Sequence, residues 1–149
     1  MALEFPSQPT AEQLGEQARG NQTALLLVGI AYVKSKGQSV EEWAHFVGDR
    51  FVSSWGEAQT ESALVVAKGI ALNLAAGEGG RIDEVSGNER DALVRGEWAR
   101  DEELAEFGLS RDDVDISTEI FRPIAENLGL NLSWSRDSKS LRIEVSRAS

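Results

Sequence analysis

The 149-residue chain contains no cysteine and a single histidine, His45. The absence of cysteine excludes disulfides, thiolate catalysis and cysteine-ligated zinc sites. A single histidine excludes histidine-rich metal sites and leaves little support for a serine–histidine mechanism. We therefore expect neither a bound metal nor a cofactor.

Basic residues are also scarce, with 15 lysines and arginines against 25 acidic residues and a formal net charge of −10. Nucleic acids and anionic membranes are bound largely through basic patches, so the composition disfavours both kinds of partner. The longest apolar run, residues 24–33, is too short to span a bilayer, and no signal peptide is apparent. We expect a soluble, cytoplasmic, acidic protein.

The remaining composition is that of an ordinary globular protein, and the length is that of one domain. An extended lead-in is expected over residues 1–9. Helical periodicity then predicts three helices, over residues 10–36, 39–55 and 57–76, the first two of which begin with capping-box patterns.

The pattern changes after Gly80, where short alternating segments replace the helical spacing. They predict two hairpins, one from residues 81–85 with 92–98 and one from 130–134 with 141–145. They also predict a charged loop at 110–115 and short helices at 101–107 and 117–128. The sequence thus predicts a single α+β domain over residues 1–149. Its N-terminal three-helix segment would pack with an antiparallel sheet built from the two C-terminal hairpins plus the two short helices.

The first predicted helix is unusually apolar. One of its faces carries Leu14, Ala18, Leu25, Val28 and Tyr32, with Asn21 in the same seam. Other apolar residues widen this surface around the second half of the helix. A helix of this kind in a small domain lies at its centre or in a dimer interface, and we expect a homodimer formed through the apolar helices.

The second predicted helix carries an arginine within an apolar stripe. Arg50 projects among side chains that recur at helical spacing: Trp43, Phe46, Val47, Phe51 and Trp55. A guanidinium keeps its charge inside a protein, so a buried one needs a carboxylate, several carbonyls or an anionic ligand.

These positions suggest a ligand-binding site. Arg50, Asn21 and Tyr32 would hold an organic acid in an apolar cleft walled by Trp43 and Phe46. The alternative is that Arg50 pairs with a core-facing glutamate such as Glu119, or extends to the surface.

Two further patterns have a functional and a structural interpretation. His45 and Asp49 are spaced for a metal or a base with its orienting partner, but a surface i,i+4 contact is favoured. The acidic segment Asp112, Asp113 and Asp115 could bind calcium, but it has neither the glycine nor the terminal glutamate of the loop signature, which favours a solvated loop.

The chain also has four tryptophans: Trp43, Trp55, Trp98 and Trp134. They either fill the core or form a flat aromatic wall for a planar ligand.

The order of parts carries a resemblance to a known family. The segment Gly37-Gln38-Ser39-Val40-Glu41-Glu42-Trp43-Ala44 opens the second helix, and Glu106-Phe107-Gly108-Leu109-Ser110 and Pro123-Ile124-Ala125 precede the last hairpin. This arrangement resembles the L-2-amino-thiazoline-4-carboxylic acid hydrolases and, more distantly, 4-vinyl-reductase-type small-molecule-binding domains. Those families carry cysteines in the C-terminal half, so no catalytic residue is transferred. The resemblance implies a dimeric small-molecule-binding scaffold.

Three functions follow as hypotheses. The favoured one is a non-catalytic small-molecule-binding or sensor-like domain for an organic acid or a planar ligand. The second is a small cofactor-independent hydrolase or isomerase whose carboxylate base, such as Glu119, has a raised pKa in a pocket. The third is an acidic protein-interaction module.

Overall fold

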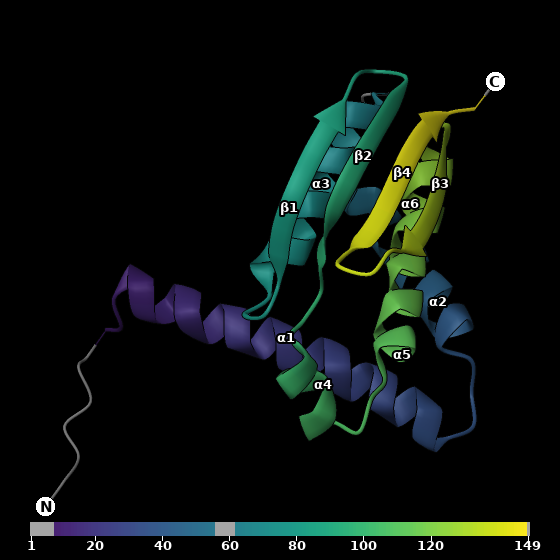
Figure 1. The fold of residues 1–149 in the computed structure, drawn as a ribbon. Coiled ribbons are helices and arrows are strands. Elements are labelled where there is room, and N and C mark those ends of the chain that lie inside the picture. Colours follow the sequence, from purple (N-terminus) through teal and green to yellow (C-terminus); the bar gives the residue numbers. More distant parts are fainter. Residues whose placement is uncertain (1–7, 56–61, 149) are drawn as a thin grey trace, which may run out of the picture.

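The computed structural model describes residues 8–55 and 62–148. Three long helices come first (Figure 1): α1 (Ala11–Ser35), α2 (Val40–Trp55) and α3 (Ala63–Ala76). The C-terminal half contains β1 (Arg81–Gly87), β2 (Asp91–Glu97), α4 (Asp101–Glu106), α5 (Arg111–Asp115), the 3₁₀ helix η2 (Ile116–Ile120), α6 (Phe121–Asn127), β3 (Leu130–Arg136) and β4 (Leu141–Arg147). The predicted α+β class, with three N-terminal helices and two C-terminal hairpins, is confirmed.

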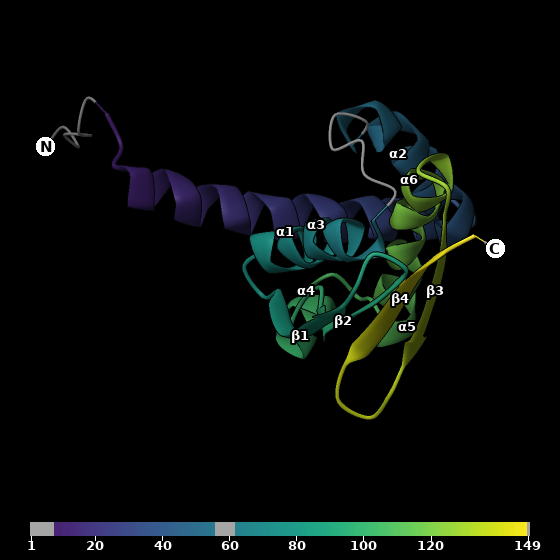
Figure 2. The same ribbon diagram turned by 90° about the horizontal axis from the view of Figure 1, so that it is seen from above.

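The two hairpins form one antiparallel sheet with the strand order β1-β2-β4-β3. Alternate side chains of β2 and β4 point into the core, as Val94, Ile143 and Val145 do, while Glu144 on the other face is exposed. Helices α3 and α6 cover the apolar face (Figures 1 and 2). The molecule is therefore built from a helical layer on one side of a four-stranded sheet.

Residues of both halves share one hydrophobic core. It joins Leu27 and Ile30 of α1, Ile70 of α3, and Val94 and Ile143 of the sheet, all of them 0% exposed. Within the described residues, no helix is both long and apolar enough to cross a membrane.

The inserted helices differ from the prediction. Residues 111–115 form helix α5 rather than a loop, because Ser110 and Asp113 build a capping box at its start. The predicted helix over 117–128 is split into η2 and α6. Pro123 lies in the first turn of α6, where a backbone N–H would have no partner within the helix, so proline loses no hydrogen bond there.

Helix α3 begins at Ala63. Ser62 is its N-cap, and its side chain accepts a hydrogen bond from the backbone N–H of Val65. The predicted start at residue 57 and most of the predicted extended lead-in lie outside the described residues.

The prediction that Asn21 and Tyr32 lie on the core face of the first helix is wrong. The buried residues of α1 are Thr23, Leu27, Ile30 and Val33, on the opposite face. Tyr32 is 61% exposed. Both faces are apolar, and periodicity alone does not distinguish the one that packs on the core.

Helix α2 likewise buries small residues most deeply: Trp43 and Trp55 of its aromatic stripe pack against the core only partly buried, and Phe46 and Phe51 are exposed. Its buried residues are Val40, Ala44 and Gly48. A Cβ atom at Gly48 would lie 2.2 Å from the backbone oxygen of Ile120. The close approach of α2 to η2 therefore requires glycine at this position.

We expect Gly48→Ala to destabilise the fold, since an added methyl group has no space beside the Ile120 oxygen. Overpacking of this kind costs about 1–3 kcal/mol, measured as the free energy of unfolding in denaturant. Gly15→Ala is the control, because a Cβ there would meet nothing within 4 Å. That helix-favouring change should stabilise the protein by about 0.5–1 kcal/mol. Equal effects of the two substitutions would contradict the packing argument.

A buried ion-pair network holds the inserted helices to the sheet. Arg136 of β3 donates to Glu97 at the end of β2, with both N–O distances 2.7 Å, and to Asp115 of α5 at 2.5 and 2.8 Å. Glu97 is 5% exposed and Asp115 is 3% exposed. Arg111 also donates to Glu97, at 3.1 Å. These hydrogen bonds raise the pKa of Arg136 above its ordinary value despite its burial.

We expect Arg136→Met to lower the free energy of unfolding by about 3–5 kcal/mol, because it leaves the buried Asp115 without its cation and Glu97 with Arg111 alone. Arg142→Met is the matched control on the neighbouring strand. Arg142 pairs with Glu144 on the open face of the sheet, where an ion pair contributes less than about 1 kcal/mol. Chemical denaturation of both variants measures the difference, and a cost at Arg136 as small as at Arg142 would refute the structural role of the network.

Candidate functional site

A groove with a mostly apolar lining is bounded by α1, α2 and α3. Its volume is about 470 Å³, within the range typical of small-molecule sites. We call it the aromatic groove. Its lining is Gln22, Leu25, Leu26, Trp43, Val47, Phe51, Trp55, Asn73, Trp98, Ile120, Phe121 and Ile124.

Three aromatic rings build one side of the aromatic groove. Trp98 and Phe121 are stacked, with ring centroids 5.5 Å apart and planes inclined by 6°. Trp55 meets Phe121 edge to face, at 6.0 Å and 63°. The indole N–H of Trp98 donates to the Thr118 hydroxyl at 3.1 Å, which satisfies its buried polar atom.

Glycines on the neighbouring helices position the two tryptophans of α2. A Cβ atom at Gly29 of α1 would lie 3.0 Å from the ring of Trp43. One at Gly69 of α3 would lie 2.7 Å from the ring of Trp55. Each indole thus packs directly on the backbone of a neighbouring helix, and the space between α1, α2 and α3 stays open.

Neutral amides supply the polar groups of the groove lining. Gln22 of α1 donates to the Asn73 carbonyl of α3 at 3.5 Å, and the Asn73 side chain donates to the Gly69 carbonyl at 2.9 Å. None of the residues lining the groove is charged. The groove therefore suits a ligand that is largely apolar and uncharged.

Of the five residues predicted to bind a ligand, only Trp43 lines the aromatic groove. Arg50 is exposed, and its guanidinium lies 4.2 Å from the centroid of the Phe46 ring. Tyr32 lies under the Lys36 ammonium at 5.5 Å, and Asn21 accepts a hydrogen bond from Gln17 at 2.9 Å. The structure does not bring these polar groups together.

The prediction that Arg50 projects among core residues is wrong. It shares its side of α2 with Phe46, which is 56% exposed, and the two side chains form a cation–π contact in solvent. A guanidinium exposed to water needs no anionic ligand. The hypothesis of an anion anchor therefore loses its physical basis, and the alternative of an extended surface arginine describes Arg50.

A second polar cluster surrounds Glu119 of η2, which is only 6% exposed. Arg122 holds both carboxylate oxygens, with N–O distances of 2.5 and 2.9 Å, and the Trp134 indole donates at 3.1 Å. His45 lies 3.0 Å from the same carboxylate. Glu119 is thus core-facing, as considered from the sequence, but its cation is Arg122 rather than Arg50.

The surroundings of Glu119 determine its ionisation. Burial acts to raise the pKa, but the hydrogen bonds from Arg122, His45 and Trp134 outweigh it and lower the pKa from 4.5 to about 2. A general base at neutral pH needs the opposite shift. The prediction that Glu119 has the raised pKa of a catalytic base is therefore wrong.

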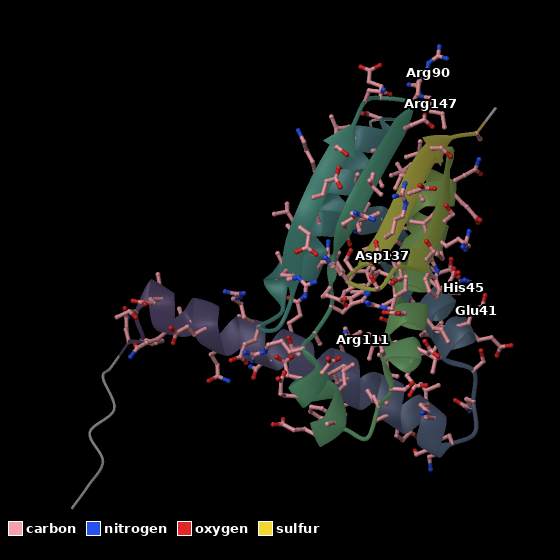
Figure 3. The ribbon with its side chains drawn as sticks, in the orientation of Figure 1. Glu41, His45, Arg90, Arg111, Asp137 and Arg147 are labelled. Atoms are coloured by element: carbon pink, nitrogen blue, oxygen red, sulfur yellow. The ribbon has the colours of Figure 1, made fainter. Side chains whose placement is uncertain are left out.

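Three ligand atoms that could hold a metal converge at the same place. Those of Glu41, His45 and Glu119 all lie within 4.8 Å of one another, and the first two residues are neighbours on α2 (Figure 3). Arg122 already occupies both oxygens of Glu119, so a cation here would have to compete with a guanidinium. We interpret the cluster as an ion-pair network that ties α2 and α6 to η2.

The remaining candidate patterns have structural roles. His45 contacts Glu119 rather than standing alone on the surface with Asp49. The acidic segment is divided between partners, because Asp113 pairs with Lys34 at 2.6 Å and Asp115 with Arg136. Two of the three carboxylates considered for calcium, Asp113 and Asp115, are therefore paired with different cations.

Comparisons with known proteins gave no matching family model, no similar curated protein and no similar solved structure. The resemblance to the thiazoline carboxylic acid hydrolases stays a prediction.

We expect Glu119→Gln to lower the free energy of unfolding by about 3 kcal/mol at pH 7, from a shift of the pKa to about 2. Because the folded pKa lies below the unfolded one, the ionised carboxylate stabilises fully above pH 4.5. This stabilisation is lost as the pH falls toward about 2, so the two unfolding curves should converge in acid. Denaturant titrations across this pH range measure it.

Glu106→Gln, on the exposed side of α4, is the control and should leave stability nearly unchanged at every pH. A Glu119→Gln difference that stays constant down to pH 2 would show that the carboxylate is not stabilised by its ionised form.

Proposed function

We propose that this protein is a small-molecule-binding domain that holds a planar, largely apolar ligand in the aromatic groove. The observation that carries the proposal is the cavity of about 470 Å³ between three helices, walled by Trp43, Trp55, Trp98 and Phe121. The sequence raised this possibility through the four tryptophans, three of which line the groove.

The form of the groove supports a flat ligand. Aromatic rings attract one another in offset stacks or edge to face, and the ring pairs around Phe121 supply surfaces for both arrangements. Gln22 and Asn73 offer neutral hydrogen-bonding groups. No arginine or lysine lines the groove, which favours an uncharged ring system over an organic acid.

Other hollows of the described chain are less suitable. A larger one, about 710 Å³, lies along the first half of α1 beside Gln13, Gln17 and Glu78, all of which are exposed. The cleft beside His45, Asp49 and Arg122 measures about 520 Å³ and borders the Glu119 network. A hydrolase or isomerase working from that cleft would need a base, and Glu119 is held in its ionised form by Arg122.

The test uses N-phenyl-1-naphthylamine, a neutral planar probe whose fluorescence rises in apolar surroundings. We expect saturable binding by the wild type. Trp55→Leu removes an aromatic wall, and Val47→Phe fills part of the space without removing a packed ring. Each should weaken binding by about tenfold or more, the scale at which a buried aromatic anchor contributes to affinity.

Phe46→Leu is the matched control, because it also replaces an aromatic residue of α2 but lies outside the groove lining. It should leave the affinity unchanged, and so should Arg50→Met. Absence of saturable binding by the wild type, or equal losses at Trp55 and Phe46, would overturn the proposal.

A further inference from the structure

Helix α1 carries a regular seam that the other described residues do not cover. From Leu14 to Tyr32 the spacing of the seam residues is 4, 3, 4, 3 and 4, the repeat of a coiled coil. The members of this α1 seam are Leu14, Ala18, Asn21, Leu25, Val28 and Tyr32. Ala11 and Ser35 continue the same spacing to the two ends of the helix.

The α1 seam is exposed throughout. Leu25 is 72% exposed, Tyr32 is 61%, Leu14 is 56% and Val28 is 49%. The residues that α1 packs on its own core, such as Leu27 and Ile30, lie on the opposite side of the helix. The seam is therefore an additional apolar surface and not a margin of the core.

The N-terminal half of α1 gives a second, independent indication of a partner. It extends beyond the rest of the described chain (Figures 1 and 2), and every residue from Ala11 to Arg19 is exposed. Helical segments of this length are marginal in water without tertiary packing. A partner other than the described residues would stabilise this half.

The charges of α1 indicate what the partner is. The helix has no charged residue from Gly20 to Val33, so the seam offers nothing to a strongly acidic or basic protein. Helices that lie on membranes are rich in lysine and arginine, whereas α1 balances Glu12 and Glu16 against Arg19 and Lys34. A neutral heptad seam is complementary to another copy of itself.

We propose that two copies of this chain associate through the α1 seam to form a homodimer. The helix has 25 residues, which gives about three and a half heptads, the length at which coiled-coil pairing is sustained. Asn21 is the one polar residue between Leu14 and Tyr32 in the seam. On this spacing Asn21 takes a d position, where burial of its amide between two helices lowers the affinity of association.

The test is sedimentation equilibrium of the full chain over a wide concentration range. We expect the wild type to approach twice the 16.2 kDa mass of one chain. Val28→Glu and Tyr32→Glu each place a charge in the seam and should weaken dimerisation at least about a hundredfold. Both residues are substantially exposed, and neither lines the aromatic groove, so folding and probe binding of the monomer should survive.

Leu72→Glu is the matched control, because Leu72 is 70% exposed but lies on α3, outside the seam. It should leave the dimer intact, whereas Asn21→Leu should tighten association about tenfold or more. A wild type that stays monomeric overturns the inference. A dimer that persists in both seam variants, or that Leu72→Glu disrupts equally, also overturns it, whatever the outcome of the probe-binding test.

Discussion

The ion-pair network around Arg136 is the constraint on which the C-terminal half depends. It joins the ends of β2 and β3 to the end of α5, and its carboxylates are almost completely removed from water. Buried charges are tolerable only when their partners are accurately placed. The network therefore fixes where η2 and α6 begin, and these two elements supply Glu119, Ile120 and Phe121 to the surroundings of α2.

The aromatic groove follows from this placement. Helix α2 contacts η2 through Gly48, and its two tryptophans contact α1 and α3 through Gly29 and Gly69. Glycine at these contacts lets backbone or ring atoms approach where a side chain would stand. Two bulky indoles then hold the three helices apart at one end of the core, and the stacked rings of Trp98 and Phe121 line the space between them.

Local patterns in the sequence predicted the elements well and their faces poorly. The capping box at Thr10 and the alternation of Leu141, Ile143 and Val145 depend on neighbours along the chain, and both predictions are confirmed. The core face of α2 is set by the close contact of Gly48 with η2. Hydrophobic periodicity does not detect this contact, because glycine has no apolar side chain. Periodicity therefore predicts that the whole aromatic stripe and Arg50 lie in the core, whereas only Trp43 and Trp55 of the aromatic residues pack against it.

The candidate site could be predicted only in part. The composition alone suggested an aromatic wall, and Trp43 was singled out, but the contacts of Trp55 with Gly69 and of Trp98 with Phe121 join segments distant in sequence. The sequence does contain a signal for the partner of Glu119: Glu119 and Arg122 are three residues apart in a helical segment, a spacing that favours an ion pair. It would have identified the cation of the buried carboxylate without Arg50.

The neighbours of α1 explain why this helix is so apolar. A helix on the surface of a domain ordinarily has one apolar stripe and a charged opposite face. The second half of α1 instead meets the core through Leu27 and Ile30, the aromatic groove through Leu25 and Leu26, and solvent through the seam at Val28 and Tyr32. A helix with a single neighbour would have had room for charged side chains between Gly20 and Val33. Their absence agrees with the proposed homodimer, in which the seam would contact a third neighbour.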